Sequence, residues 1–308
     1  MSSFTSHLYT GPDDLQQMIT WVQQTRPQSR IHDYPTPTDL RELVAFPDAL
    51  AHLRLWHNEA GQLAAFAFVD AYHNLNFELD WAASTPALET NLVNWGITCR
   101  RRSAAADESP LTLDASSPVT HPDRLAFLER HGFIAQPTTV LSLSRSLALP
   151  IPEPSLPPGF SLRHARTDSA ELASWVALHR AAFGTQHMTI AHRQAMISDP
   201  EYDPTLDLLI IAPDGRLAAY CVGSIKANTH TGQPEGFTDP VATHPDFQGR
   251  GLAKAILLAG MHRLQARGVD TVLLGTSSEN KAMLAAAHAV GFHITATTYW
   301  FTRSIELE

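Results

Sequence analysis

Two glycines, Gly249 and Gly251, stand in a polar loop between a strand-like segment, 237–243, and an apolar-periodic helix. The first turn of a helix has backbone N–H groups without intrahelical partners and carries the positive end of the helix dipole. A glycine has no Cβ, so an anion can come close to the backbone at these positions. Arg250 and Lys254 add positive charge. These residues predict a phosphate-binding loop at a helix start.

The spacing of the loop residues discriminates between phosphate ligands. A dinucleotide site requires G-x-G-x-x-G followed by an acidic residue, and a nucleoside-triphosphate site requires G-x-x-x-x-G-K-[ST]. Residues 248–253 read Q-G-R-G-L-A and match neither pattern. Binding of a nicotinamide dinucleotide is therefore disfavoured.

The Q-x-x-G-x-A pattern that begins at Gln248 resembles the pyrophosphate loop of the GCN5-related N-acetyltransferases, the GNAT family. The surroundings are similar as well, with Pro245 after the strand, a strand over 271–275, a helix opening at Glu279-Asn280 and then Gly291-Phe292. The resemblance covers about 150 residues. It implies an N-acetyltransferase that uses acetyl-CoA as co-substrate and no metal.

The resemblance also implies which residues bind the cofactor. In this family the strand before the loop splays from its neighbour, and its backbone pairs with the pantetheine arm like an added strand. Asn280 matches the family asparagine that reaches this arm, and a role in the helix cap is the alternative. The implied cofactor-binding residues are Val241, Ala242, Thr243, Gln248, Gly249, Arg250, Gly251, Leu252, Ala253, Lys254 and Asn280.

Acyl transfer from a thioester to an amine requires a neutral amine, a polarised carbonyl group and a protonated leaving thiolate. Many relatives place a tyrosine, as general acid, seven residues after the helix-start asparagine, and this position is Ala287 here. The adjacent His288 is rotated by about 100° on a helix, which favours a structural role. Tyr299 is a further hydroxyl near the cleft, although its aromatic neighbours favour a core position.

Acidic residues on the cofactor strand are the candidates for the general base. Glu235, Phe237 and Asp239 share one strand face, because side chains alternate. Some family members have a glutamate where Phe237 stands, and the two acidic residues flank it. Asp239 and Glu235 are therefore the catalytic candidates. Alternatively, Asp239 fixes a bulge or turn before Pro240, and Glu235 lies in a loop.

Length and composition indicate a globular protein of two domains. The 308 residues are 44% hydrophobic and 17% charged, with a net charge of −9 and no basic stripe that would suggest nucleic acid. No apolar run approaches the roughly 18 residues that span a bilayer, and no signal-like segment opens the chain, so we expect no membrane partner and a cytoplasmic location. Cys99, Cys221 and the scattered histidines indicate neither a disulfide framework nor a metal site.

The two halves of the chain repeat one order of expected elements. The hairpin-turn glycines Gly61 and Gly215 are 154 residues apart, and Gly132 and Gly291 are 159 apart. This tandem layout is similar to the two-domain members of the family, among which mycothiol synthase is one named type. Each half is expected to have an α+β fold with a mixed, mostly antiparallel twisted sheet flanked by helices. The expected division is a degenerate domain over 1–147, a stiff proline-rich linker over 148–158 and an acetyl-CoA-binding domain over 159–308.

The first half lacks the phosphate loop. Residues 84–89 read S-T-P-A-L-E, with no glycine and with a carboxylate in the first helical turn. Because Cβ atoms crowd a pyrophosphate there and Glu89 repels it, we expect no cofactor in this half. A structural and acceptor-shaping role follows.

The sequence thus predicts an acyl-CoA-dependent N-acyltransferase that transfers the acyl group directly to a small-molecule amine, as a monomer or homodimer. The alternative is a catalytically silent acyl-CoA-binding sensor or scaffold, because the tyrosine is missing and the first half is degenerate. Nothing in the sequence identifies the acceptor.

Overall fold

The computed structural model describes residues 4–27, 30, 33–45, 47–104, 110–228 and 231–306. The chain forms two compact units. Unit 1 comprises residues 1–139 with 297–308, and unit 2 comprises residues 140–296. Each unit combines a sheet with flanking helices, so the expected α+β architecture is confirmed.

Unit 1 is built on an antiparallel sheet in the order β1-β2-β3-β4, with the bounds Thr5–Leu8, Leu53–His57, Leu63–Val69 and Leu75–Leu79. Its helices are α1 (Pro12–Thr25), α2 (Pro37–Val44), the short α3 (Pro47–Leu50), α4 (Pro86–Arg102) and α5 (Pro122–Arg130). Side-chain alternation separates two cores. Leu55 and Phe66 face the core with α1 and α2, whereas Ala67 and Phe77 face the core with α4 and α5.

Unit 2 is built on strands in the order β6-β11-β10-β9-β8-β7, with the bounds Ile134–Ser146, Thr271–Ser277, Pro234–Thr243, Leu217–Ala227, Asp207–Ile211 and Ser161–His164. Its helices are α6 (Ser169–Phe183), α7 (Ile190–Ser198), α8 (Leu252–Gln265) and α9 (Lys281–Ala289). The pair β10–β11 is parallel and the other pairs are antiparallel, as expected for a mixed sheet.

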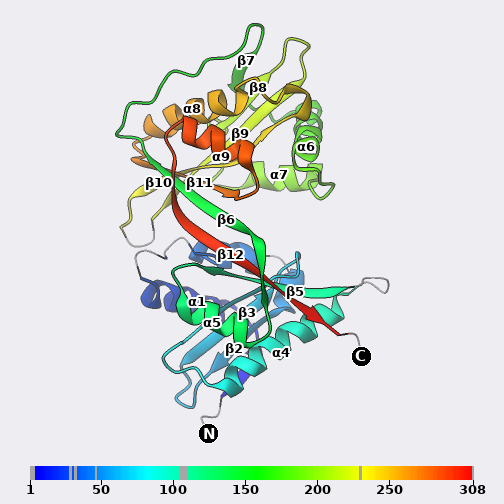
Figure 1. Ribbon diagram of the computed structural model, residues 1–308, viewed down its shortest axis with the longest axis vertical. Coiled ribbons are helices and arrows are strands. Elements are labelled where there is room, and N and C mark those ends of the chain that lie inside the picture. Colours follow the sequence, from blue (N-terminus) through cyan, green and yellow to red (C-terminus); the bar gives the residue numbers. More distant parts are fainter. Residues whose placement is uncertain are drawn as a thin grey trace. The chain divides into compact units, whose positions relative to one another are not determined.

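The helices of unit 2 cover both faces of its sheet (Figure 1). Cys221 and Val241 belong to the core that contains residues of α8 and α9. Their ladder neighbours Tyr220 and Ala242 belong to the core beneath α6. Because successive side chains of β9 and β10 point to opposite faces, two helix layers pack on opposite sides of these strands.

The division into units differs from the predicted boundaries because two strands change units. Strand β6 begins in unit 1, but its residues 140–146 pair with β11 in unit 2 (green in Figure 1). Strand β12 (His293–Ile305) begins in unit 2, but its residues 298–305 pair with β5 (Leu111–Pro118) in unit 1 (red). The proline-rich segment 148–158 thus lies within unit 2 instead of between the units.

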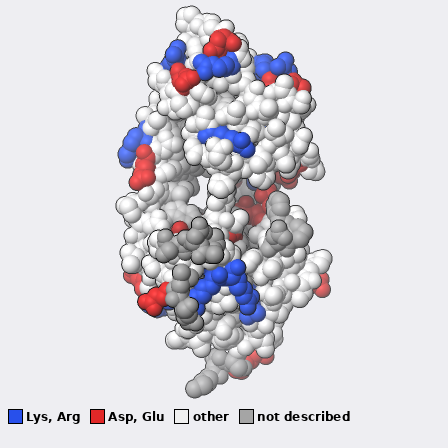
Figure 2. All heavy atoms as spheres, turned by 90° about the vertical axis from the view of Figure 1, so that its right-hand side faces the viewer, with Lys and Arg blue, Asp and Glu red and all other residues white. Residues whose placement is uncertain are grey.

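The surface carries few charges on the face drawn in Figure 2, where basic and acidic side chains mostly form small mixed groups. In unit 2, Arg216 forms ion pairs with Asp214 and Asp246 at 2.9 and 2.7 Å. Among the described residues, no helix has the length and apolar character needed to cross a membrane.

Candidate active site

Strand β10 leaves its parallel neighbour β11 after a short contact. The paired residues are Gly236 with Val272 and Phe237 with Leu273. The β9–β10 register then shifts between Thr238 and Val241, at Asp239-Pro240, whose peptide bond is cis. Beyond this bulge, residues 241–243 pair with β9 only, while β11 pairs with β6. One edge of residues 241–243 is therefore left open, as the resemblance implied.

A cavity of about 470 Å³ lies beside this open strand. Ten of the eleven residues predicted to bind the cofactor line it: Val241, Ala242, Thr243, Gln248, Gly249, Gly251, Leu252, Ala253, Lys254 and Asn280. The exception is Arg250, whose guanidinium lies 5.7 Å from the ring centroid of Phe247 and contacts the Asp246 carbonyl at 3.5 Å. The structure thus brings the predicted residues of the loop, the strand and the following helix together around one cavity.

The two loop glycines adopt backbone conformations that L-residues rarely take, with φ of 74° at Gly249 and 77° at Gly251. The first N–H groups of an α-helix have no intrahelical partner. Gly251 is the N-cap of α8 and has no side chain that could cap them. A Cβ built at either glycine meets no atom within 4 Å. Glycine is therefore required by the backbone conformation, and the space above the loop is free for a ligand.

Three polar side chains surround this opening. Lys254 is exposed in the first turn of α8. Gln248 Nε2 donates to the Thr243 carbonyl at 3.3 Å. Asn280 Oδ1 accepts from the Met283 N–H at 3.0 Å and caps α9. The cap role that the sequence left open is thus present, and Asn280 lines the cavity as well.

The apolar walls of the cavity were not predicted from the sequence. These residues are Ala182 and Phe183 at the end of α6, Phe247 before the loop, and Ala282, Met283 and Ala286 on α9. A signal existed for α9, because Asn280, Met283 and Ala286 are spaced by three residues and share a helix face. No such signal existed for α6, which is distant in sequence.

Asp239 lies at the bulge where the strands separate. Its Oδ2 is 3.4 Å from the position that a Cβ on Gly275 of β11 would take, so the carboxylate faces β11. Desolvation by the surrounding protein raises the pKa of Asp239 to about 6, although the residue is exposed to solvent on one side. A carboxylate with this pKa is mostly ionised at neutral pH and remains basic enough to accept a proton.

The second acidic candidate, Glu235, lies four residues earlier, opposite Lys226 in the β9–β10 ladder. Its carboxylate accepts a hydrogen bond from Asn228 Nδ2 at 2.9 Å. Glu235 is therefore in a strand, not in a loop, and neither it nor Asp239 lines the cavity.

The other positions considered for proton transfer, Ala287, His288 and Tyr299, do not line the cavity. Ala287 is fully buried. His288 is exposed, and its Nδ1 contacts the Phe292 carbonyl at 3.1 Å after the end of α9, which agrees with the structural interpretation. Tyr299 belongs to unit 1, where it pairs with Ser117 of β5, and it is exposed, so the core position that its aromatic neighbours favoured is wrong.

The start of α4 in unit 1, the counterpart of the phosphate loop, is closed by side chains. Glu89 is buried and accepts hydrogen bonds from Arg130 at 2.7 and 2.9 Å, from His131 at 3.0 Å and from Ser84 at 2.9 Å. Desolvation alone raises the pKa of Glu89, but these hydrogen bonds outweigh it and lower the pKa to about 2. The Glu89 carboxylate was expected to repel a pyrophosphate. Instead, Arg130 neutralises its charge, and the paired side chains cover the helix start.

Neither cysteine is part of a disulfide. Cys99 and Cys221 are free and buried, on α4 and β9 respectively. Within the part of the chain that the structure describes, no cluster of three His, Cys, Asp or Glu side chains could hold a metal ion.

Residues 172–292 match the model of the acetyltransferase (GNAT) family. A mycothiol acetyltransferase of Nocardioides sp. (strain ATCC BAA-499 / JS614) is 28% identical over 195 residues, which cover 59% of this chain and 66% of that protein. The mycothiol acetyltransferase of Salinispora arenicola is 32% identical over 178 residues, or 56% and 57% of the two chains. That of Cellulomonas flavigena is 28% identical over 297 residues, or 86% and 80%. The matches to the first two thus span less than two thirds of these relatives.

Two solved structures are similar over nearly the whole chain. A GCN5-related N-acetyltransferase from Sphaerobacter thermophilus has a TM-score of 0.76 at 21% identity and covers 99% of this chain and 98% of its own. A tandem GNAT protein from the clavulanic acid biosynthesis pathway has a TM-score of 0.75 at 16% identity and covers 99% and 100%. The expected tandem layout of two such folds is therefore confirmed.

Proposed function

We propose that this chain is a two-domain member of the GNAT superfamily and that its unit 2 transfers an acyl group, in the first place acetyl, from coenzyme A to an amine. The observation that carries the proposal is the cavity beside the open edge of β10, which continues to the start of α8. A strand edge and an uncapped helix start are the two surfaces that an amide-containing arm and a pyrophosphate require.

In this proposal, each part of the site binds one part of acetyl-CoA. The N–H groups from Gly249 to Lys254 receive the pyrophosphate, with the Lys254 ammonium nearby. The open edge of residues 241–243 pairs with the amides of the pantetheine arm, and Asn280 contacts the same arm. Gln248 supports the loop through its bond to Thr243. Arg250 contributes its backbone, because its side chain does not line the cavity.

Asp239 acts as the general base. An amine is protonated at neutral pH and must lose a proton before its nitrogen attacks the thioester carbonyl; the C–N bond then forms and the C–S bond breaks. The Asp239 carboxylate lies where β10 and β11 separate, and its raised pKa suits this role. Glu235 is the weaker candidate, because its carboxylate already accepts a hydrogen bond from Asn228. As the C–S bond breaks, the nitrogen loses its second proton, and a water molecule relays it to the leaving thiolate, since Ala287 offers no hydroxyl.

The acceptor is a small-molecule amine. Because these relatives are named mycothiol acetyltransferase, amines related to mycothiol are the first acceptors to test. The identities are modest, so the acceptor panel should also include amino-acid derivatives, aminoglycosides and peptide N-termini.

The test is acetyl-CoA turnover by the full chain, followed as acceptor-dependent release of free CoA thiol and as acetylated product by mass spectrometry. Saturable turnover with at least one amine supports the proposal. Lack of acetyl-CoA binding in calorimetry would overturn it, whatever acceptor is used.

A second function, that of a catalytically silent acyl-CoA-binding protein, is favoured by one observation. The position where many relatives have a catalytic tyrosine is Ala287, which is fully buried and cannot donate a proton. Micromolar binding of acetyl-CoA without turnover over the whole amine panel would support this function over the first.

A further inference from the structure

The two units differ in the residues of one helix face. Helices α5 and α9 begin and end 159 residues apart, so Arg124 of α5 is equivalent to Met283 of α9, and Phe127 is equivalent to Ala286. In unit 2, Met283 and Ala286 line the cavity together with Val241. The equivalent face of unit 1 thus carries two larger side chains.

The strand that faces this helix also carries a larger side chain in unit 1 than in unit 2. Phe77 stands opposite Ala67 in the β3–β4 ladder, and Val241 stands opposite Cys221 in the β9–β10 ladder. Ala67 and Cys221 are 154 residues apart, which is the separation of the hairpin-turn glycines of the two halves. Phe77 is therefore the equivalent of Val241, and it too is the larger residue.

These three side chains pack against one another in unit 1. Phe77 and Phe127 are fully buried, and their ring centroids are 4.8 Å apart. The guanidinium carbon of Arg124 lies 3.8 Å from the centroid of the Phe77 ring. Two tilted rings and a guanidinium thus occupy the space that is a cavity in unit 2.

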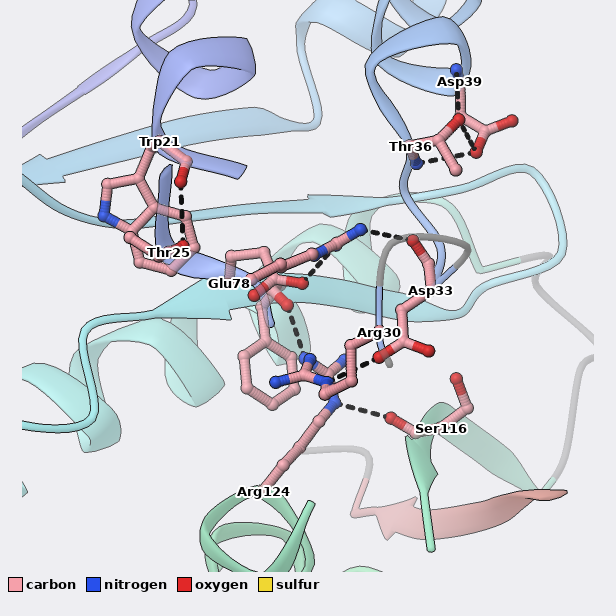
Figure 3. A network of polar contacts seen from close by, with 11 residues as sticks. Trp21, Thr25, Arg30, Asp33, Thr36, Asp39, Glu78, Ser116 and Arg124 are labelled. Carbon is pink, nitrogen blue, oxygen red and sulfur yellow. Dashed lines mark hydrogen bonds and ion pairs between the residues drawn. The ribbon is translucent and has the colours of Figure 1, made fainter. Parts of the chain in front are cut away.

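Arg124 also satisfies backbone groups of both neighbouring strands. Its Nη1 donates to the Phe77 carbonyl of β4 at 2.6 Å, and its Nε donates to the Ser116 carbonyl of β5 at 2.7 Å, as drawn for Ser116 in Figure 3. The next residue of β4, the buried Glu78, is paired through its carboxylate with Arg26 at 2.5 Å (Figure 3). A polar side chain of the protein therefore connects the two strands that correspond to the separated pair β10 and β11.

We infer that the residues at the third and sixth positions of this helix, together with the phosphate loop, determine which unit takes the cofactor. Arg124 and Phe127 fill the cleft of unit 1 from within, whereas Met283 and Ala286 keep the cleft of unit 2 open. The inference rests on the proposed function, because acetyl-CoA is the ligand assigned to the open cleft. Met283 and Ala286 thus leave space for acetyl-CoA in unit 2, which is a role separate from that of the phosphate loop.

The first experiment transfers the filled cleft to unit 2. In the full chain, Ala286→Phe and Met283→Arg should each raise the Kd for acetyl-CoA at least 30-fold in calorimetry, because the new side chains occupy the ligand's space. The matched control is Ala285→Phe, on an exposed position of the same helix that does not line the cavity, and it should bind as the wild type does. Wild-type affinity in Ala286→Phe would overturn the inference.

The second experiment opens unit 1. The double variant Arg124→Met, Phe127→Ala should lower the melting temperature by roughly 5–10 °C, since it empties a packed core site. Its affinity for acetyl-CoA in unit 2 should stay within about twofold, and the exposed control Glu129→Ala should melt like the wild type. An unchanged melting temperature of the double variant would contradict the filled cleft. If the wild type binds no acetyl-CoA, the proposed function fails, but this melting experiment still tests the filling.

Discussion

The starts of α8 and α4 are equivalent places in the two repeats, and they present opposite surfaces to an anion. At α8, Gly251 leaves the first N–H groups uncovered beside a cavity. At α4, Thr85 caps the helix through a contact of 3.3 Å from the Leu88 N–H, and Glu89 is buried against Arg130. Both helices have the same dipole. The difference therefore teaches that an anion site depends on whether the protein's own groups already cover the helix start.

The largest effect is expected from making α8 resemble α4. Gly251→Asp should abolish acetyl-CoA binding in calorimetry, because the carboxylate occupies the phosphate position and an aspartate is strained at a φ of 77°. Gly268→Asp is a matched control, since Gly268 has a φ of 76° and equally free space but does not line the cavity. Unchanged affinity in Gly251→Asp would remove the phosphate loop from the proposed site.

The next largest effect is expected at the bulge of β10 that contains Asp239. Unit 1 has no equivalent of this bulge, because the β3–β4 ladder continues without one. Asp239→Asn should lower kcat by roughly 100-fold and leave the Kd for acetyl-CoA unchanged, since it removes a general base and not a binding group. In the wild type the rate should rise with pH through about 6, the pKa of Asp239, because the base acts in its ionised form.

Glu235→Gln is the comparison for this variant, because it changes the other acidic residue of β10 and should retain kcat within about threefold. A wild-type pH profile in Asp239→Asn, or a larger loss in Glu235→Gln, would transfer the proton-transfer role to another group.

A smaller effect is expected where the cover of α4 is removed. Glu89→Gln should lower the free energy of unfolding by about 1–3 kcal/mol at pH 7, because it breaks a buried ion pair whose partner Arg130 is half-exposed. The pKa of Glu89 is lowered from 4.5 to about 2, so its contribution is complete above pH 4.5 and is lost as the pH falls towards 2.

Urea unfolding of the wild type and of Glu89→Gln at pH 7 and at pH 3 measures this contribution. The difference between the two proteins should shrink at the lower pH. Equal stability at pH 7 would show that the ion pair does not hold the start of α4 closed.

The smallest effects are expected from removing the two basic side chains of the loop, Lys254 and Arg250. Lys254→Ala should weaken acetyl-CoA binding by roughly 2–5-fold, and less so at high salt, because the ammonium is exposed. Arg250→Ala should change the affinity by less than Lys254→Ala, since its side chain does not line the cavity. The reverse order would mean that Arg250 turns towards the phosphates when the ligand binds.

The sequence was informative where local pattern determines structure. The strand, loop and helix around Gly251 were found because glycine and the helix start impose their own geometry. The repeat was found because turn glycines and helix ends recur at fixed separations. Asp239 was named, and a bulge before Pro240 was one of its expected roles, but the orientation of its carboxylate towards β11 depends on how two strands distant in sequence pack.

The exchange of strands β6 and β12 could not be predicted from their sequences. Residues 138–147 and 297–305 have similar patterns, TTVLSLSRSL and TTYWFTRSI, so each could complete either sheet. Register and partner depend on long-range packing, such as that of Leu143 in unit 2 and Phe301 in unit 1. Arg124 and Phe127 were missed for a related reason, because filling of a cleft is visible only when two distant helices are compared.

The exchanged strand β12 sets an order of events during synthesis. Strand β5 leaves the ribosome early, but its partner, residues 298–305, is made only after all of unit 2. Since chains fold as their segments emerge, the sheet of unit 1 keeps an unpaired edge throughout translation of unit 2, and the amino-terminal repeat is the last to be completed. Nascent-chain proteolysis should therefore find the repeat with the phosphate loop protected first.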